Sequence, residues 1–83
     1  MGKQIRWSEK ARRDVRSIEQ ATALQILRTI GRFLKTGEGD LRQMTDVYPP
    51  MLRLRAQNHR VLLRDQGDYY EVVRVGDRKN IYQ

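Results

Sequence analysis

Arginines are the side chains of this 83-residue chain best suited to chemistry. Thirteen of its 17 cationic residues are Arg and only four are Lys. A planar guanidinium binds a phosphate or a carboxylate through two parallel hydrogen bonds, which an ammonium group does not do. With ten acidic residues, the formal net charge is +7. We therefore expect a polyanionic partner, with nucleic acid first, an acidic protein second and an anionic membrane third. The alternative is a solvated basic surface.

The arginines of the C-terminal half fall into a strand pattern. Arg53 and Arg55 alternate with Leu52 and Leu54, so one face of this strand is cationic and the other is apolar. The neighbouring predicted strands carry Arg60, Arg64 and Arg74. Like charges close together on a sheet repel, which indicates a face that binds phosphate. The alternative is a solvated face whose charge is balanced by Asp65, Asp68 and Glu71.

The C-terminal segment 75–82 (VGDRKNIY) adds Arg78, Lys79 and the phenol of Tyr82. A tyrosine has a reference pKa of about 10, so Tyr82 serves as a base only where nearby cations lower that pKa. His59 is the single imidazole. Its reference pKa of about 6.5 suits proton transfer near neutral pH, although a lone histidine at the start of a strand is more often structural.

Several classes of site are excluded by composition. The chain has no cysteine and one histidine, which rules out disulfides, cysteine-ligated zinc and multi-histidine metal sites. It also lacks a glycine-rich phosphate loop and a Ser-His-Asp arrangement. We expect no cofactor. Because no apolar run exceeds three residues, we expect no membrane span and no signal sequence, and a single domain over residues 1–83 in the cytoplasm.

The N-terminal half predicts the elements that support this face. Residues 3–7 form a short strand, and Ser8 fits the N-cap of a helix. A second helix covers residues 21–35 and ends before Gly37. With a joint near residues 20–22, the two helices are expected to form an antiparallel hairpin.

The remaining elements are strands. Residues 39–46 are irregular or a short strand, and the period of two then predicts strands at 51–56, 60–65 and 69–75. The turns fall at 57–58 and 66–67, Gly76 ends the last strand, and residues 80–82 add a short extended tail. Trp7 and Phe33 are expected in the core, as is one of the adjacent pair Tyr69 and Tyr70, while the other tyrosine is free to stack on a base.

The predicted fold class is α+β, in the order β-α-α-β-β-β. The N-terminal strand and the helical hairpin pack on one face of a small antiparallel sheet, which leaves the second face for water or a ligand. The strand register decides which arginines share that face, and the sequence does not fix the register.

Two stretches resemble the RelE/ParE toxin superfamily of bacterial type II toxin–antitoxin modules. Residues 51–64 (MLRLRAQNHRVLLR) are similar to the family's basic strand, turn and Arg-Val strand. Residues 71–82 (EVVRVGDRKNIY) are similar to its closing strand, Gly, Arg and terminal Tyr. The helices and the order of elements match as well, so the resemblance covers nearly the whole chain. It implies a compact domain whose sheet cradles RNA.

The RelE-like branch of this superfamily cleaves messenger RNA in the ribosomal A site. The resemblance therefore implies a ribosome-dependent endoribonuclease that inhibits translation, in which the RNA 2′-OH attacks the scissile phosphate. The implied catalytic residues are Arg53, Arg60, Arg78 and Tyr82. The other cations of the strands and tail, together with the imidazole, are expected to bind RNA: Arg55, Arg64, Arg74, Lys79 and His59.

The resemblance also implies partners. These are messenger RNA in the ribosomal A site, ribosomal RNA, and an acidic antitoxin that folds on binding and covers either the arginines or the helices in a hetero-oligomer. Two alternatives remain open: a ParE-like inhibitor of DNA gyrase without catalysis, and an inactive member that only binds its antitoxin. Asp77 favours these alternatives, because it stands where the family commonly has a basic residue or a histidine.

Overall fold

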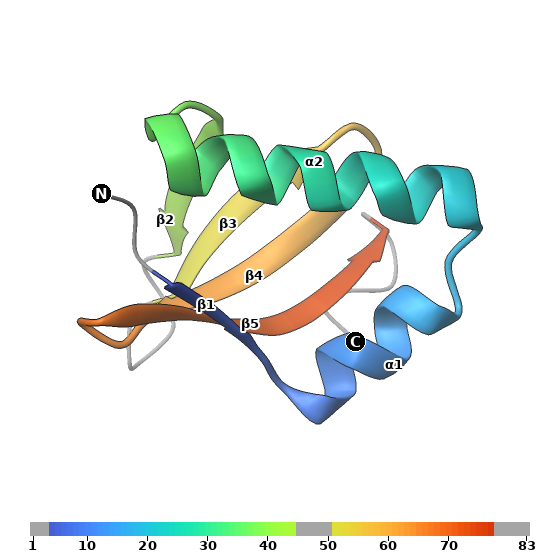
Figure 1. Ribbon diagram of the computed structural model, residues 1–83, viewed down its shortest axis with the longest axis horizontal. Coiled ribbons are helices and arrows are strands. Elements are labelled where there is room, and N and C mark those ends of the chain that lie inside the picture. The colour runs from blue at the N-terminus through green and yellow to red at the C-terminus, as the bar shows by residue number, and fades with distance from the viewer. Residues whose placement is uncertain (1–3, 45–50, 78–83) are drawn as a thin grey trace.

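The computed structural model describes residues 4–44 and 51–77, and all structural statements refer to these residues (Figure 1). Two helices and five strands follow in the order β1 (Gln4–Trp7), α1 (Glu9–Arg16), α2 (Gln20–Thr36), β2 (Asp40–Met44), β3 (Met51–Ala56), β4 (His59–Asp65) and β5 (Tyr69–Asp77). The predicted α+β class is confirmed. The segment 39–46, expected to be irregular or a short strand, contains β2.

The five strands form one sheet in the order β1-β5-β4-β3-β2. Strands β2 to β5 are an antiparallel meander, as the sequence predicts. β1, however, pairs in parallel with β5, so the expectation of a wholly antiparallel sheet is wrong for this pair. The physical reason is the connection: both helices lie between β1 and the meander, and they carry the chain to the far edge of the sheet before β2 begins (Figure 1).

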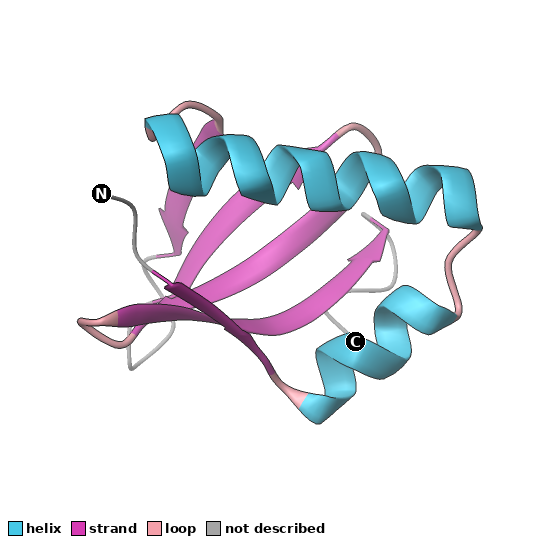
Figure 2. Cartoon of the chain, viewed as in Figure 1, coloured by secondary structure: helices cyan, strands magenta, loops and turns pink. Residues whose placement is uncertain are grey.

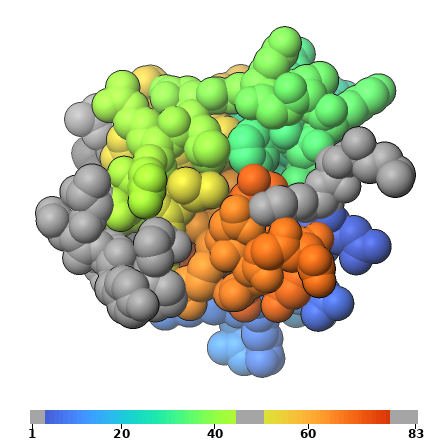
Figure 3. All heavy atoms as spheres, turned by 90° about the vertical axis from the view of Figure 1, so that its left-hand side faces the viewer, coloured from blue at the N-terminus to red at the C-terminus, as the bar shows by residue number. Residues whose placement is uncertain are grey.

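The two helices cover different parts of the sheet. α2 lies across the strands and contacts β3, whereas α1 lies against β5 (Figure 2). Seen from the end of the molecule at which α2 finishes, the green atoms of that end lie above the orange segment that contains the β4–β5 turn (Figure 3). No helix among the described residues is both long and apolar enough to cross a membrane.

α1 also satisfies the backbone at the outer edge of β5. Ser8 donates from its backbone N–H to the carbonyl oxygen of Val72 and from Oγ to that of Val73. Further along, the Asp14 carboxylate accepts from the N–H of Val75 at 2.9 Å. Two side chains of the α1 segment thus cover the part of β5 that extends beyond β1, where an open edge would invite pairing with another chain.

Local signals in the sequence account for most of the element ends. Ser8 caps α1 by accepting from the N–H of Ala11, and Gly37 ends α2 with φ 77°, as predicted. The turn at 57–58 differs in detail. Gln57 takes a positive φ of 58° there, although asparagine is the residue of the pair that tolerates positive φ more readily.

Two boundaries differ from the expected ones. The helices are joined at 17–19 and not at 20–22, because Ser17 ends α1 and Glu19 precedes α2. β5 continues through Gly76 to Asp77, so the expectation that this glycine ends the strand is wrong. The expected extended tail at 80–82 lies outside the described residues.

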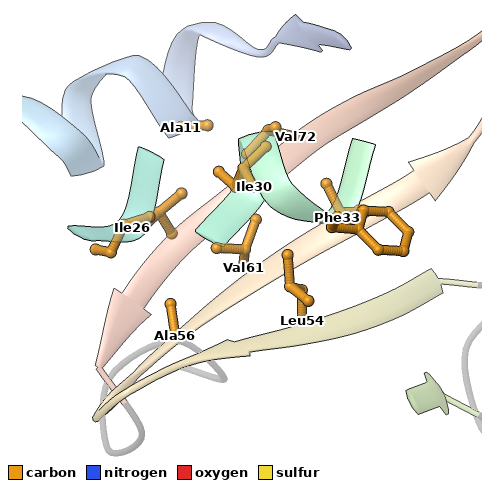
Figure 4. Packing of buried hydrophobic residues seen from close by; sticks show 10 residues of the cluster. Ala11, Ile26, Ile30, Phe33, Leu54, Ala56, Val61 and Val72 are labelled. Atoms are coloured by element: carbon orange, nitrogen blue, oxygen red, sulfur yellow. The ribbon is translucent and has the colours of Figure 1, made fainter. Parts of the chain in front are cut away.

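The core lies between α2 and the sheet (Figure 4). Ile26, Ile30 and Phe33 of α2 pack against apolar side chains of β3, β4 and β5, namely Leu54, Ala56, Val61, Leu63, Val72 and Val75. Phe33 is buried and Trp7 packs against the same cluster, as the sequence predicts. Tyr70 is the core tyrosine, with its ring centroid 5.4 Å from that of Phe33. Tyr69 therefore points to the opposite face.

Candidate nucleic-acid interface

The register of the central strands brings the predicted arginines onto one face. Leu54 is fully buried and pairs with Val61, so both point to the helices. Arg53 and Arg55, which alternate with Leu54, point the other way. Arg60 is the cross-strand partner of Arg55. The two guanidinium side chains thus leave neighbouring strands at the same level and on the same side of the sheet.

Further arginines belong to the same face. Arg42 pairs with Arg53 across β2 and β3, and Arg64 lies two residues beyond Leu62 on β4. Arg6 alternates with two residues that pack against the core, Ile5 and Trp7. We call this set the arginine face, and it consists of Arg6, Arg42, Arg53, Arg55, Arg60 and Arg64.

Few carboxylates balance this face. Asp40 Oδ1 is 3.7 Å from Arg42 Nε, and Glu71 is the cross-strand partner of Arg64. Asp65, which the sequence offered as a balancing acid, accepts a hydrogen bond from the N–H of Gly67 in the β4–β5 turn. Among the residues that the structure describes, six arginines and two strand carboxylates therefore share this face, and these side chains carry a net positive charge.

Arg60 is the most buried of these cations, with 9% of its surface exposed. Its Nη1 donates to the carbonyl oxygen of His59 at 3.3 Å, and no carboxylate among the described residues forms an ion pair with it. Nε of Arg64 is also buried, and within the same residues it has no hydrogen-bond partner. Burying a cation without an anion is unfavourable, so these two positions suit an anionic ligand.

Arg74 reaches a different environment from the other predicted RNA-binding arginines. Its register partner is Leu62, which would place it on the arginine face. Its Nε instead donates to Asp14 Oδ2 at 2.9 Å, and both side chains are less than a quarter exposed. The charge of Arg74 is therefore neutralised within the molecule. Sequence reasoning missed Asp14, which stands among the α1 arginines and gives no sign of a partner 60 residues away.

A β-bulge explains why the side of Arg74 could not be read from the sequence. The pairing shifts between Leu62 and Leu63, so that Arg74 pairs with the first and Val72 with the second, while Val73 has no partner. A strict period of two along β5 would place Arg74 with Val72, toward the helices. The extra residue returns it to the opposite face.

His59 lies on the helix side of the sheet. It pairs with Ala56, which is buried in the core, and it alternates with Arg60. The imidazole lines a cleft at the joint between the helices, together with Asp14, Glu19, Thr22 and Asp77 among others. This arrangement separates His59 from the arginine face and weakens its candidacy as a base for chemistry there.

The remaining predicted residues, Arg78, Lys79 and Tyr82, lie outside the described residues. The structure does describe the strand that leads to them. Gly76, near the end of β5, is the cross-strand partner of Arg60. In the described part of the chain, no group of three or more His, Cys, Asp or Glu side chains could hold a metal ion.

The geometry fits the binding of a phosphodiester. Paired guanidinium groups on Arg55 and Arg60 can donate to the non-bridging oxygens of one phosphate, and Arg53 lies one row further along the sheet. Such donors stabilise the additional negative charge that develops when a phosphate is attacked. Binding an acidic protein segment would use the same donors.

A comparison with protein-family models identifies the family of the chain. The family model for the ParE toxin of the type II toxin–antitoxin system, parDE, matches residues 5–82. A search of the curated proteins found no match.

Solved structures resemble the chain over most of its length. One is from the RelB–RelE antitoxin–toxin complex of Methanococcus jannaschii, with 18% identity, a TM-score of 0.76, and coverage of 94% of this chain and 95% of that one. Another is from the RelBE2 toxin–antitoxin complex of Mycobacterium tuberculosis, with 17% identity and a TM-score of 0.79. The match covers 94% of this chain and 100% of that one. A third is from the chromosomal ParDE system of P. aeruginosa, with 16% identity and a TM-score of 0.66. The match covers 90% of this chain and 95% of that one.

At such identities, these likenesses establish the fold, and the family model establishes the family. The α+β architecture is shared with these RelE and ParE structures, and residues 5–82 match the ParE toxin family. The chain is therefore a type II toxin–antitoxin toxin of the RelE/ParE superfamily.

Proposed function

We propose that this toxin is a ribosome-dependent messenger RNA endoribonuclease. The observation that supports the proposal is the pairing of Arg55 with Arg60, next to Arg53, on the sheet face that points away from the helices. Two like charges directly opposite each other destabilise a sheet. A polyanion between them turns this repulsion into attraction, and single-stranded RNA supplies phosphates in a row.

The proposed cleavage requires the protein mainly to position the RNA and to supply positive charge. RNA carries its own nucleophile, the 2′-OH, next to the scissile phosphate. Its oxygen bonds to phosphorus while the bond from phosphorus to the 5′-oxygen of the next nucleotide breaks, which leaves a 2′,3′-cyclic phosphate, and the departing 5′-oxygen takes a proton from water. Arg53 and Arg60 stabilise the negative charge of the pentacoordinate phosphorus intermediate. Tyr82 removes the proton from the 2′-OH, a role that requires nearby cations to lower the pKa of its phenol below the ordinary value. Because DNA lacks this hydroxyl, the mechanism requires that RNA is cleaved and DNA is not.

The test is induced expression of the chain, followed within minutes by primer extension on a translated reporter messenger RNA. We expect new in-frame cuts with the wild type and a loss of cutting in Arg60→Ala and Tyr82→Phe. Arg13→Ala is the matched control, because Arg13 is exposed on α1 and pairs with Glu9. Variants Arg60→Ala and Tyr82→Phe that cut ribosome-bound RNA as fast as the wild type would refute this assignment.

A second candidate function is inhibition of DNA gyrase without catalysis. It is favoured by the family model, which describes the ParE toxin of the parDE system. In this case expression arrests growth while messenger RNA stays intact, and the purified chain blocks supercoiling by purified gyrase. Normal growth with intact RNA would point to an inactive member that only binds its antitoxin.

We also propose an acidic antitoxin as the partner. Several of the similar structures are toxin–antitoxin complexes, and the net charge of +7 favours a negatively charged segment. The two large apolar side chains most exposed among the described residues, Leu24 and Leu27, lie on α2 and suit such a segment. Leu27→Asp is expected to weaken capture of the antitoxin encoded beside this toxin, while Arg13→Ala leaves capture unchanged.

A further inference from the structure

A tyrosine and an arginine are stacked at one end of the arginine face. The guanidinium carbon of Arg6 lies 4.4 Å from the ring centroid of Tyr69. The two residues come from the parallel strands β1 and β5, in which Gln4 pairs with Tyr69 and Arg6 pairs with Glu71. The parallel pairing, which the sequence did not predict, is therefore what brings them together.

Tyr69 is not needed by the core. Its neighbour Tyr70 points to the helices and contacts Phe33, so the ring of Tyr69 lies on the opposite side of the sheet and is only partly buried. Arg6 is exposed, and its cross-strand neighbour Glu71 does not form an ion pair with it. The guanidinium lies over the ring instead. The result is a partly exposed pair of stacked planar groups.

This pair continues the arginine face in space. The rows of the face run from Arg55 and Arg60, through Arg53, to the row in which Arg64, Glu71 and Arg6 are neighbours. Successive rows on one face of a sheet are about 6.6 Å apart, twice the rise per residue. Tyr69 is the next position after Glu71 on this side of β5. The line of cations thus ends at an aromatic plane.

We propose that Tyr69, stacked with Arg6, is a nucleobase-binding platform at the end of the arginine face. It holds one base of a single-stranded RNA whose phosphates contact Arg64 and the rows beyond. Aromatic rings and guanidinium planes both stack on bases, and the stacking tolerates any base because each has a π-face. The proposal rests on the proposed function only in taking RNA as the ligand of the face.

The test measures RNA affinity without cleavage. The probe is a fluorescent single-stranded 2′-O-methyl RNA of ten nucleotides, which cannot be cleaved by its own 2′ oxygen, and a matching strand with abasic positions. Fluorescence anisotropy with the full chain gives the Kd for the wild type, Tyr69→Phe and Tyr69→Leu. Thermal unfolding of each variant reports whether the pair only joins β1 to β5.

We expect Tyr69→Phe to bind within about twofold of the wild type, because it keeps the ring. Tyr69→Leu is expected to bind the normal strand roughly 5- to 100-fold more weakly, the range for the loss of one stacked base. On the abasic strand the two variants should bind alike. Equal affinities of Tyr69→Leu and the wild type for the normal strand, with or without a lower Tm, would overturn the platform.

The outcomes separate the platform from the nuclease. If Tyr69 binds RNA in a base-dependent way but messenger RNA is not cleaved in cells, the platform is supported and the nuclease assignment is refuted. If messenger RNA is cleaved in cells but RNA affinity does not depend on Tyr69, the nuclease assignment is supported and the platform is refuted. A wild type that does not bind the ten-nucleotide strand at all overturns the platform.

Discussion

Arg55 and Arg60 form a cross-strand pair of like charges, which is unfavourable for the stability of the sheet. They are directly opposed on β3 and β4, where like charges disfavour pairing by about 0.2–1 kcal/mol. Arg55 is exposed and donates from Nε to the carbonyl oxygen of Gln57, an exposed hydrogen bond of small worth. Arg60, in contrast, is buried. The repulsion can therefore be relieved by changing Arg55 alone.

Arg55→Gln is expected to raise the free energy of unfolding by up to about 1 kcal/mol at low salt, since it removes one of the two like charges. The gain should shrink at high salt, because salt screens exposed charges. Urea unfolding at two salt concentrations measures both effects. If Arg55→Gln is less stable than the wild type at both, the hydrogen bond to Gln57 outweighs the repulsion.

Asp14 is the residue that a pattern-based reading of the sequence had least chance of finding. Its carboxylate is the partner of Arg74 and of the N–H of Val75, and it lies in a helix whose other charges are exposed. By contrast, Arg53 and Arg55 could be placed together in advance, because they alternate with Leu52 and Leu54, whereas Arg60 joins them only through the register of β3 and β4. Alternation fails where a bulge interrupts it and carries no information on partners distant in sequence.

Asp14→Ala is expected to lower the free energy of unfolding by about 2–3 kcal/mol. It leaves a largely buried guanidinium and a backbone N–H at the sheet edge without their acceptor. Glu9→Ala is the matched control on the same helix. Glu9 pairs with Arg13, but both side chains are more than 70% exposed, so we expect a loss of at most about 0.5 kcal/mol. Equal losses in urea unfolding would contradict a special role for Asp14.

At the scale of elements, helices and the meander follow from local signals, while the placement of β1 does not. Ser8 and Gly37 bound the helical region, and the period of two marks β3 and β4. A four-residue strand such as β1 carries no signal for its neighbour or direction. Its partner is decided by the packing of Ile5 and Trp7 on the core and by the covering of β5 with α1.

Replacing either of two glycines in the α2 region by alanine is expected to change the stability of the protein, in opposite directions. A Cβ on Gly31 would meet no atom within 4 Å, and the residue is exposed within the helix, so Gly31→Ala should raise the free energy of unfolding by about 1 kcal/mol. Gly37 has equally open surroundings but a φ of 77°. Gly37→Ala should therefore lower stability, by about 1 kcal/mol, through backbone strain alone. Thermal or urea unfolding of the two variants measures both changes. A stability change of the same sign in Gly31→Ala and Gly37→Ala would contradict the role given to the backbone conformation of Gly37.

At the scale of the whole molecule, the positive charge behind the net charge of +7 is unevenly distributed over the surface. The helices hold several arginines, but the described arginines of the sheet other than Arg74 are gathered on the face that the helices leave uncovered. Composition predicts a polyanionic partner, and the arginine face is the surface that such a partner would contact. Composition could not separate RNA from an acidic protein, because both present anions to the same guanidinium groups.

Salt dependence tests whether this surface, and not the total charge, binds RNA. Each phosphate contact to a single strand contributes about 0.7 to the slope of log K against log salt concentration. Arg55→Ala and Arg64→Ala should each reduce the slope for the ten-nucleotide 2′-O-methyl RNA by about that amount. Arg13→Ala removes the same charge from α1 and should leave the slope unchanged. Equal reductions in all three variants would mean that RNA responds to net charge, and the arginine face would lose its claim as the interface.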